Sequence, residues 1–362
     1  MARGHTDSSP SHCGRFDVPV ALDSASICPR SKLLTQLTKA PRALAALLSD
    51  EERAGVLKYF HVRDAKMALA SQLLKHLVVA RCARSGAVPV PWRQTVLSRD
   101  KHGKPVYYYK AGSSGAQPVV FNVSHQAGVV VLVAVYGGDG IDNSAFQVGI
   151  DVVSPSERRT RDHEMIADEA RRSGTGLASA GWPHFVDVHA DVLAPGEVRH
   201  LKQLLSFAGS SGNDGRLRSF YGLWCLREAY VKMTGEALLA EWLADLEFRA
   251  FCVPGVPLAA AAADTATAAT ATDKDADSLT QGEMVTQYDI RFRGALVGDS
   301  VNMCLRSVGA DYMVCSAVRA TPGDEAKTAA HKATALEFPT TDTIQVLQMD
   351  DILNFVERSG RA

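Results

Sequence analysis

The sequence lacks the cysteine patterns that indicate zinc or disulfide chemistry. Its seven cysteines, at positions 13, 28, 82, 225, 252, 304 and 315, are odd in number and far apart. No CxxC pair or Cys/His cluster with the spacing of a structural zinc site occurs. We therefore expect free thiols in a reducing compartment.

Long hydrophobic runs are also missing. The longest strongly apolar segment, residues 129–136, is much shorter than the ~20 residues that a membrane-spanning helix needs. The N-terminal sequence MARGHTDSSPSHCGRFD contains no apolar segment of the kind found in signal peptides. These absences predict a cytoplasmic protein that does not bind membranes.

Neither sign of charge is in excess. Lys and Arg total 39 and Asp and Glu total 40, so the net charge is -1 and no global basic field suggests nucleic-acid binding. Any anion must be bound locally. The G-x-G-x-x-G and P-loop patterns are absent, so side chains would have to bind a nucleotide. No G-x-S-x-G elbow surrounds Ser124, which argues against a serine hydrolase.

The overall composition is that of a globular protein with a large core. The chain has 362 residues, of which 46% are hydrophobic and 22% charged. Residues 1–14 are polar, and we expect them to be disordered. Two halves follow, residues 15–147 and 148–362, with a low-complexity insert at about 255–285 that we interpret as a flexible loop.

Two helices are predicted at the start of the first half. Ser49 and Glu52 have capping-box spacing, and apolar residues at intervals of three and four predict a second helix from Asp64. Arg63, just before that helix, could hold an anion at its N-terminus. Strands are predicted at 105–110, 119–123, 129–136 and 146–153, and the third is apolar on both faces, as a central buried strand is.

The second half repeats this arrangement. Loops are predicted at 155–190, helices at 197–207 and 219–234, and strands at 246–252, 287–292, 300–307 and 311–319. Gly235 stands where a helix C-terminus favours glycine, and Ile344, Leu347, Ile352 and Phe355 of the tail are expected to pack on the body. We therefore predict an α+β fold of two pseudo-symmetric halves, with a site at their interface.

The helix at 219–234 carries the most informative pattern. Phe220, Trp224, Glu228 and Lys232 follow one another at intervals of four, so they form one stripe with aromatic anchors above a carboxylate and an ammonium. A surface Glu/Lys pair, worth roughly 0.2–0.5 kcal/mol, is the simpler interpretation of this helix taken alone.

Three other segments change that interpretation. Asp151 ends the strand VGID, where an aspartate commonly caps a turn but could pair with Glu228 to bind Mg²⁺. Ser124 and His125 follow a predicted strand, next to Asn122, and offer donors to phosphate oxygens. The segment RDKHGKP, residues 99–105, is either a solvated loop or a shaped cationic turn.

Together, GKP, FNVSHQ, VGIDV and F-x-x-x-W-x-x-R-E-x-x-x-K-x-x-G, in that order, resemble the 4′-phosphopantetheinyl transferase superfamily. The similarity covers about residues 55–320. It is closest to the large monomeric type that activates surfactin, peptide and polyketide synthases, and to its broad-specificity eukaryotic members.

The resemblance implies an activity and a set of partners. Enzymes of this family transfer the phosphopantetheine arm of coenzyme A to a serine of an apo carrier domain and release 3′,5′-ADP. The implied carriers belong to fatty acid, polyketide and nonribosomal peptide synthases, and to an aminoadipate reductase, which would connect the chain with secondary metabolism and lysine biosynthesis. The implied cofactor is Mg²⁺, and the implied state is a monomer.

The resemblance also implies roles for individual residues. Asp151 and Glu228 match the Mg²⁺ ligands, and Glu228 or Glu197 matches the base that takes the serine proton, with Lys232 beside the phosphates. The positions that match coenzyme A contacts are Arg63, Arg99, Asp100, Lys101, His102, Gly103, Lys104, Asn122, Val123, Ser124, His125, Asp151, Glu228 and Lys232.

Two positions depart from the family pattern. Val153 stands where many bacterial members have a second acid, so water or Gln126 would complete the metal site. Arg227 stands where lysine is frequent, which keeps the charge and changes its geometry. Two other functions remain open: a coenzyme A or nucleotide-binding module without catalysis, and a metal-dependent phosphohydrolase.

Overall fold

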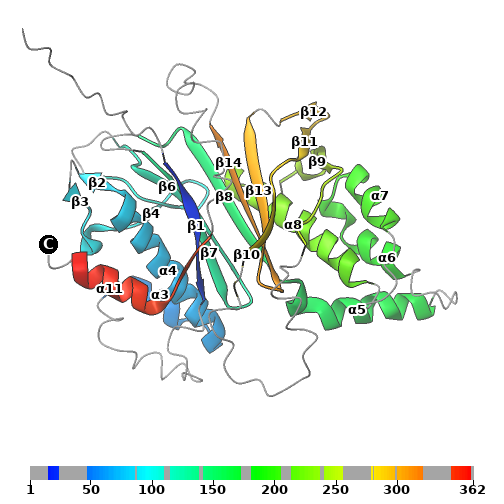
Figure 1. Cartoon of the computed structure of the whole chain (residues 1–362), viewed down its shortest axis with the longest axis horizontal. Helices are drawn as coiled ribbons and strands as arrows, with labels where there is room; N and C mark the ends of the chain where they lie inside the picture. The colour runs from blue at the N-terminus through cyan, green and yellow to red at the C-terminus, as the bar shows by residue number, and fades with distance from the viewer. Residues whose placement is uncertain are drawn as a thin grey trace, which may run out of the picture.

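Two four-stranded sheets pack against each other, and each is covered on its outer side by one long helix (Figure 1). The computed structural model describes residues 15–23, 47–85, 88–109, 115–137, 142–172, 181–204, 213–236, 240–255, 279, 281–297, 300–320 and 344–359. The predictions for residues 1–14 and for most of the 255–285 insert lie outside this part. No helix within it has the length and hydropathy needed to cross a membrane.

The first sheet has the strand order β15 (Gln345–Leu347), β1 (Arg15–Asp23), β7 (Val129–Tyr136) and β6 (Val119–Gln126). Its outer helix is α4 (Val62–Cys82), which packs beside α3 (Asp50–Leu57) and α11 (Met349–Ser359). Ser49 and Glu52 form the predicted capping box of α3. Short elements complete this half: β2 (Arg84–Ser85), β3 (Val88–Pro89), η2 (Trp92–Gln94), β4 (Ser98–Arg99) and β5 (Pro105–Val106).

The second sheet has the order β10 (Gln281–Val285), β13 (Val301–Val308), β14 (Tyr312–Ala320) and β8 (Phe146–Val153). Its outer helix is α8 (Asp214–Thr234), and α4 and α8 each have 21 residues. The rest comprises α5 (Pro155–Arg172), α6 (Gly181–Val188), η3 (Ala190–Val192), α7 (Pro195–Gln203), η4 (Leu243–Asp245), and a small sheet of β12 (Ala295–Leu296), β11 (Asp289–Phe292) and β9 (Leu246–Arg249).

Strand β7 joins the two halves because both of its faces are apolar. Val130 and Leu132 face the core beneath α4, whereas Val131 and Val133 pack against the valines of β8 and β14. The central buried strand predicted from the sequence is thereby confirmed, as is the α+β fold of two similar halves.

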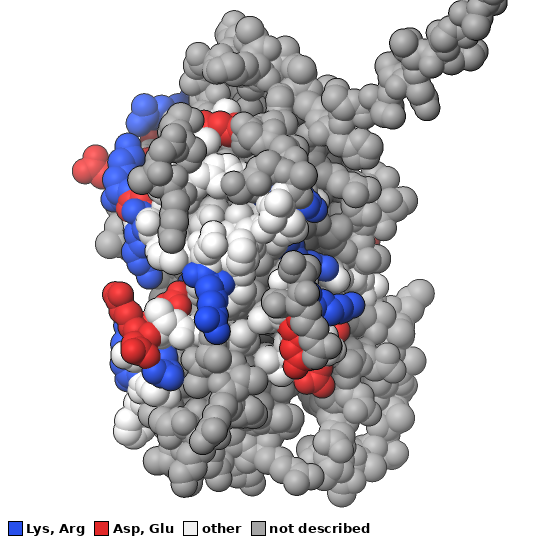
Figure 2. Space-filling model, turned by 90° about the vertical axis from the view of Figure 1, so that its left-hand side faces the viewer, with Lys and Arg blue, Asp and Glu red and all other residues white. Residues whose placement is uncertain are grey.

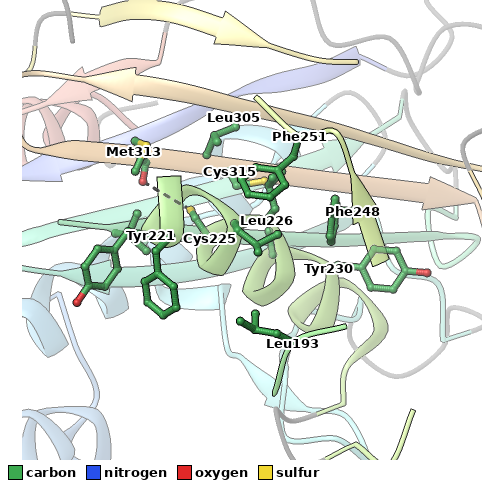
Figure 3. Packing of buried hydrophobic residues seen from close by; sticks show 14 of the residues in the cluster. Leu193, Tyr221, Cys225, Leu226, Tyr230, Phe248, Phe251, Leu305, Met313 and Cys315 are labelled. Atoms are coloured by element: carbon green, nitrogen blue, oxygen red, sulfur yellow. Dashed lines mark hydrogen bonds between the residues drawn. The ribbon is translucent and has the colours of Figure 1, made fainter. Parts of the chain in front are cut away.

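Helix α8 lies close against β8 because of a glycine. A Cβ atom at Gly149 would collide with the carbonyl oxygen of Ala229 and the amide nitrogen of Met233. The helix is anchored by its buried face, in which Cys225, Leu226 and Tyr230 meet β13, β14 and the loops beyond (Figure 3). Phe220 is buried and Trp224 partly buried in this core, as the stripe predicted.

Several predicted elements need correction. Within the predicted loop at 155–190, residues 155–172 and 181–188 form the helices α5 and α6, whose Ile166, Trp182 and Phe185 are buried in the second core, and residues 173–180 lie outside the described part. Helix α4 begins at Val62, so Arg63 lies inside its first turn. The end of the predicted insert is strand β10, which pairs with β13.

Charge is distributed without a dominant sign. On the face at the left of Figure 1, the described basic and acidic side chains alternate around an area of other residues (Figure 2). This agrees with the net charge of -1 and directs the search for anion-binding groups to local clusters.

Candidate functional site

Three predicted residues from three elements meet in one buried hydrogen-bonded cluster. Lys232 of α8 donates from Nζ to Asp151 Oδ1 of β8 at 2.6 Å and to Ser124 Oγ of β6 at 2.9 Å. The Ser124 hydroxyl also donates to Asp151 Oδ1 at 2.9 Å. Asp151 and Ser124 are buried, so the cluster brings the two halves together through polar contacts of low solvent exposure.

The fold explains this meeting. Along β8, Val148, Ile150 and Val152 point into the interface between the sheets, and the alternation turns Asp151 toward α8. The prediction that Ser124 and His125 follow the strand is wrong, because both belong to β6, which continues to Gln126, and the turn comprises Ala127 and Gly128.

Glu228 lies one turn before Lys232 on α8. Among the described residues, no hydrogen bond or ion pair engages its half-buried carboxylate. Burial raises the pKa of Glu228, and the nearby negative charge of Asp151 raises it further, although Lys232 opposes both effects. The two carboxylates are therefore close enough to repel each other.

The cationic segment at 99–105 forms an ordered turn. Asp100 Oδ1 accepts hydrogen bonds from the amides of His102 and Lys104 at 2.8 and 2.9 Å, and Gly103 has a φ of 80°. Arg99 donates to the carbonyl of Gly103 at 2.6 Å. Lys101 is exposed at the turn. The shaped-turn interpretation of this segment is the one that the structure supports.

Lys104 connects this turn to the C-terminal end of α8. Its Nζ donates to the carbonyl oxygen of Met233 at 2.9 Å, one of the last carbonyls of the helix. Burial lowers the pKa of Lys104 to about 8, while the charge of Asp100 opposes that shift. His102 lies against Gly235, the left-handed residue that ends the helix.

A cavity of about 250 Å³ opens beside this turn. Both halves line it: the turn and the start of β6 on one side, the start of β8 and the end of α8 on the other. The predicted residues in its wall are Asp100, Lys101, His102 and Lys104. Apolar side chains of β6 and β8 lie there beside the polar and charged groups of the turn, a combination that suits a flat heterocycle that carries phosphates.

The remaining predicted residues of β6 have different surroundings. Asn122 is buried, and its Oδ1 accepts the amide hydrogen of Ile150 at 3.0 Å, which joins β6 to β8. Val123 is partly buried in the first core. Burial lowers the pKa of His125, and the positive charge of Lys232 lowers it further.

Arg63 lies at the edge of the same region, in a contact that spans the halves. Its Nη1 is 3.5 Å from Glu157 Oε1 of α5, and Gln126 Nε2 donates to Glu157 Oε2 at 3.0 Å. Arg63 remains largely exposed, so its guanidinium is accessible to a ligand. Sequence reasoning missed Glu157, since a glutamate in the first turn of an unpredicted helix carried no signal.

Glu197 lies apart from this cluster. It is 1% exposed and accepts hydrogen bonds from Arg227 Nη1 at 2.7 Å, from the amide of Phe248 at 2.8 Å and from the amide of Ala194 at 2.8 Å. Arg227 also donates to the carbonyls of Leu246 and Leu243. The ion pair of Arg227 and Glu197 thereby joins α7, α8 and β9 through buried hydrogen bonds.

Asp151 and Glu228 have the chemistry that a divalent cation requires. Within the described ranges, no group of three or more His, Cys, Asp and Glu side chains forms a metal site. However, the two carboxylates are hard oxygen donors whose mutual repulsion a cation would relieve. Gln126 uses its amide nitrogen for Glu157, which leaves its Oε1 as a further oxygen donor.

Comparisons with known proteins decide the family. Residues 37–137 match the family model described as "4'-phosphopantetheinyl transferase, N-terminal", and residues 147–260 match the one described as "4'-phosphopantetheinyl transferase superfamily". The "4'-phosphopantetheinyl transferase 1" of Fusarium mangiferae is 38% identical over 340 residues, which is 94% of this chain and 95% of the relative. The chain belongs to the 4′-phosphopantetheinyl transferase superfamily.

Two further relatives define its place among these transferases. The "4'-phosphopantetheinyl transferase NpgA" of Emericella nidulans is 34% identical over 78% of this chain and 79% of the relative. The "L-aminoadipate-semialdehyde dehydrogenase-phosphopantetheinyl transferase" of Xenopus laevis is 27% identical over 54% of this chain and 51% of the relative. The broad-specificity eukaryotic type that the motifs suggested is thereby confirmed. The chain is a transferase that modifies carrier proteins.

Proposed function

We propose that coenzyme A binds between the two halves, with its nucleotide at the turn of residues 99–105 and its pyrophosphate at the Ser124–Asp151–Lys232 cluster. The cavity beside the turn supports the first part, because it combines apolar walls with Lys104 and His102. Lys232, with His125 nearby, supports the second part, because it supplies positive charge where the pyrophosphate would lie.

The reaction needs one proton acceptor and charge neutralisation. The carrier serine oxygen attacks the phosphorus that bears the pantetheine arm, and the bond from that phosphorus to the bridging oxygen breaks. The serine proton goes to the base, and 3′,5′-ADP leaves with the bridging oxygen. Lys232 stabilises the negative charge that develops on these phosphate oxygens.

Glu228 is the base that the geometry supports best. Its carboxylate has no partner among the described side chains and its pKa is raised, so it can accept a proton more readily than an ordinary glutamate. Glu197 is engaged by three donors in a buried ion pair, which argues for a structural role. The free carboxylate of Glu228 beside the Asp151–Lys232 pair is the observation that carries the proposal.

Asp151 and Glu228 would hold Mg²⁺, with the Oε1 of Gln126 or water in place of the acid that Val153 replaces. When bound, the ion would supply positive charge against the phosphate oxygens of coenzyme A. Their common neighbour Lys232 supports this assignment, because its Nζ donates to Asp151 at 2.6 Å and Glu228 precedes it by one turn of α8.

The aminoadipate client is proposed from the name of one relative, and the other client carriers are proposed from the resemblance of the motifs. We infer carriers of polyketide, nonribosomal peptide and fatty acid synthases, and of an aminoadipate reductase, as the clients of a single monomeric enzyme. The match to fungal 4′-phosphopantetheinyl transferases and to an aminoadipate-type transferase supports carrier proteins as the class of client. A cytoplasmic location stays a prediction.

A mass-shift assay tests the function. Purified protein, coenzyme A and Mg²⁺ are incubated with a panel of apo carriers, and each carrier is expected to gain the mass of one phosphopantetheine arm. Carriers that keep their mass while coenzyme A still binds would indicate a binding module. Phosphate released without any carrier would indicate a phosphohydrolase.

A further inference from the structure

Gln126 is the last residue of β6, and its amide contacts the second half of the molecule. Its Nε2 donates to Glu157 Oε2 of α5 at 3.0 Å. An ionised carboxylate only accepts hydrogen bonds, so this contact requires the NH₂ end of the amide to face Glu157. The carbonyl end, Oε1, is therefore turned away from Glu157, and no residue in the described part of the chain donates a hydrogen bond to it.

Strand β6 carries Gln126 on the face that meets the second half. Residues two apart on a strand share a face. On this face, the Oδ1 of Asn122 accepts the amide hydrogen of Ile150 at 3.0 Å. The next residue of the face, Ser124, donates from Oγ to Asp151 Oδ1 at 2.9 Å. Gln126 continues this series, so its side chain lies on the side of the Asp151 cluster.

Glu157 is held by the same strand that carries Asp151 and by a contact from the first half. Helix α5 begins at Pro155, one residue after the end of β8, and the amide of Glu157 donates to the carbonyl of Ser154 at 3.1 Å. Arg63 Nη1 of α4 lies 3.5 Å from Glu157 Oε1. Each oxygen of the carboxylate thus has a partner, and the acceptor that faces Gln126 is fixed from both halves.

The proposed cation site lacks an oxygen ligand next to Asp151 on β8. Val153, two residues along the same face, is apolar and buried in the second core. Carboxylate, carbonyl and water oxygens suit Mg²⁺ and Mn²⁺. An amide can present either its oxygen or its NH₂ group, and the NH₂ group would repel a cation. The amide of Gln126 is a useful ligand only if its orientation is fixed.

We propose that Glu157 is a positioning residue of the cation site, which holds the amide of Gln126 so that Oε1 is available to the ion that Asp151 and Glu228 would bind. Outer partners of this kind orient the groups that contact a metal and tune its affinity. The inference rests on the proposed function, in which Gln126 or water completes the site. It assigns that place to Gln126 and gives its control to Glu157.

Binding of Mn²⁺ to the full chain, without coenzyme A or carrier, tests the inference. The loss of the electron paramagnetic resonance signal of the free ion measures the affinity. Glu157→Met removes the acceptor and keeps the length of the side chain, whereas Glu157→Gln keeps an oxygen that can accept from Gln126. Glu164→Met, the same change at an exposed glutamate of α5, is the matched control. Gln126→Ala is measured alone and combined with Glu157→Met.

Glu157→Met is expected to weaken Mn²⁺ binding about tenfold, at the lower end of the effect of losing an outer partner. Gln126→Ala should weaken it by a similar factor. In the Gln126→Ala background, Glu157→Met should add less than about twofold, because the amide that it orients is gone. Glu157→Gln and Glu164→Met should bind Mn²⁺ nearly as tightly as the wild type.

Wild-type Mn²⁺ affinity in Glu157→Met would overturn the inference. Equal weakening by Glu157→Met with and without Gln126 would overturn it too, because Glu157 would then link the halves without acting through the amide. Melting temperatures identify a folding defect, and Glu157→Ala replaces the methionine variant if that protein does not fold.

Arm transfer by the wild type separates this inference from the proposed function. A wild type that modifies carriers while Glu157→Met keeps its Mn²⁺ affinity would contradict the role of Glu157 alone. A folded wild type that neither binds Mn²⁺ nor modifies any carrier would contradict both.

Discussion

Asp151 and Glu228 are two carboxylates in unlike surroundings. Asp151 accepts hydrogen bonds from Lys232 and Ser124, whereas Glu228 has no such partner among the described residues and has a raised pKa. This difference matters for the reaction: both carboxylates can hold the cation, but only that of Glu228 keeps oxygen lone pairs that no described residue engages and that can take a proton, directly or through a water.

Replacing Glu228 therefore tests the base. Glu228→Gln is expected to lower the rate of arm transfer by about 10²–10⁴-fold, the usual contribution of general acid–base catalysis. The melting temperature should change little, since no described hydrogen bond depends on this carboxylate. Mass spectrometry of the carrier over time measures the rate.

Two variants serve as controls for that experiment. Glu164→Gln changes an exposed glutamate of α5 and should transfer at the wild-type rate. Glu197→Gln should lower the free energy of unfolding, because it leaves the buried Arg227 without its counter-charge. A folded Glu197→Gln protein that is as inactive as Glu228→Gln would contradict the assignment of the base.

Glu52 gives the first half a pH dependence. Burial alone would raise its pKa, but hydrogen bonds from His76 and Ser49 outweigh burial and lower the pKa to about 2 from 4.5. A lowered pKa stabilises the folded state above pH 4.5, and this contribution is lost as the pH falls toward 2.

We therefore expect Glu52→Gln to lower the free energy of unfolding at pH 7 by about 1–3 kcal/mol and to reduce its dependence on pH below 4.5. Urea denaturation at a series of pH values measures both effects. Glu51→Gln, its exposed neighbour in the same helical turn, should behave like the wild type. An equal loss for both variants would show that the network around His76 does not stabilise the fold.

At the scale of elements, the contact between β8 and α8 positions the site. Asp151 lies on the strand and both Glu228 and Lys232 lie on the helix, so their separation depends on how closely the two elements pack. Gly149 permits that approach, because any side chain there would meet the backbone of α8.

Gly149→Ala should push the helix outward. We expect a loss of about 1–3 kcal/mol in the free energy of unfolding, as overpacking a core usually costs, and a lower transfer rate in the protein that folds. Gly55→Ala is the matched control, since nothing lies within 4 Å of its Cβ position. Its helical position should make it neutral or slightly stabilising. The denaturation midpoints of the Gly149→Ala and Gly55→Ala proteins are compared. Equal midpoints would contradict the conclusion that α8 packs closely on β8 at Gly149.

Elements with a clear pattern could be predicted from the sequence. Strand β7 is apolar throughout because both of its faces are buried, and α8 ends at Gly235 as its capping residue indicates. Helix α5 was missed because its buried residues, such as Ile166, are few and stand among charged residues on a solvated surface. Helix α6 was missed because Gly181 and Pro183 at its start are residues typical of loops. Strand β1 has no local signal and depends on its partners β7 and β15.

At the scale of the whole molecule, the C-terminus returns to the first half. Strand β15 pairs in parallel with β1, and Met349 and Ile352 of α11 are buried in the core beneath α4. The two halves also share the valine-rich interface of β7, β8 and β14. The chain therefore closes on itself, and we expect one cooperative unfolding transition rather than two.

Ile352→Ala tests this closure. The residue is 0% exposed, so the substitution should cost about 2–5 kcal/mol, as large-to-small changes in cores do. The loss should appear in the single transition of the whole protein in thermal or urea unfolding. Glu357→Ala, on the exposed side of the same helix, should leave that transition unchanged. A separate early transition of the first half would contradict the closed arrangement.

The candidate site was predictable where residues carry a motif. Asp151, Ser124 and Lys232 were proposed from three distant segments, and the fold brings them within hydrogen-bond distance.

The most direct test of the central claim is the mass of an apo carrier domain after incubation with the protein, coenzyme A and Mg²⁺. We predict a gain of one phosphopantetheine arm with the wild type and a far slower gain with Glu228→Gln. A folded wild-type protein that leaves every carrier in the panel at its original mass would contradict the account.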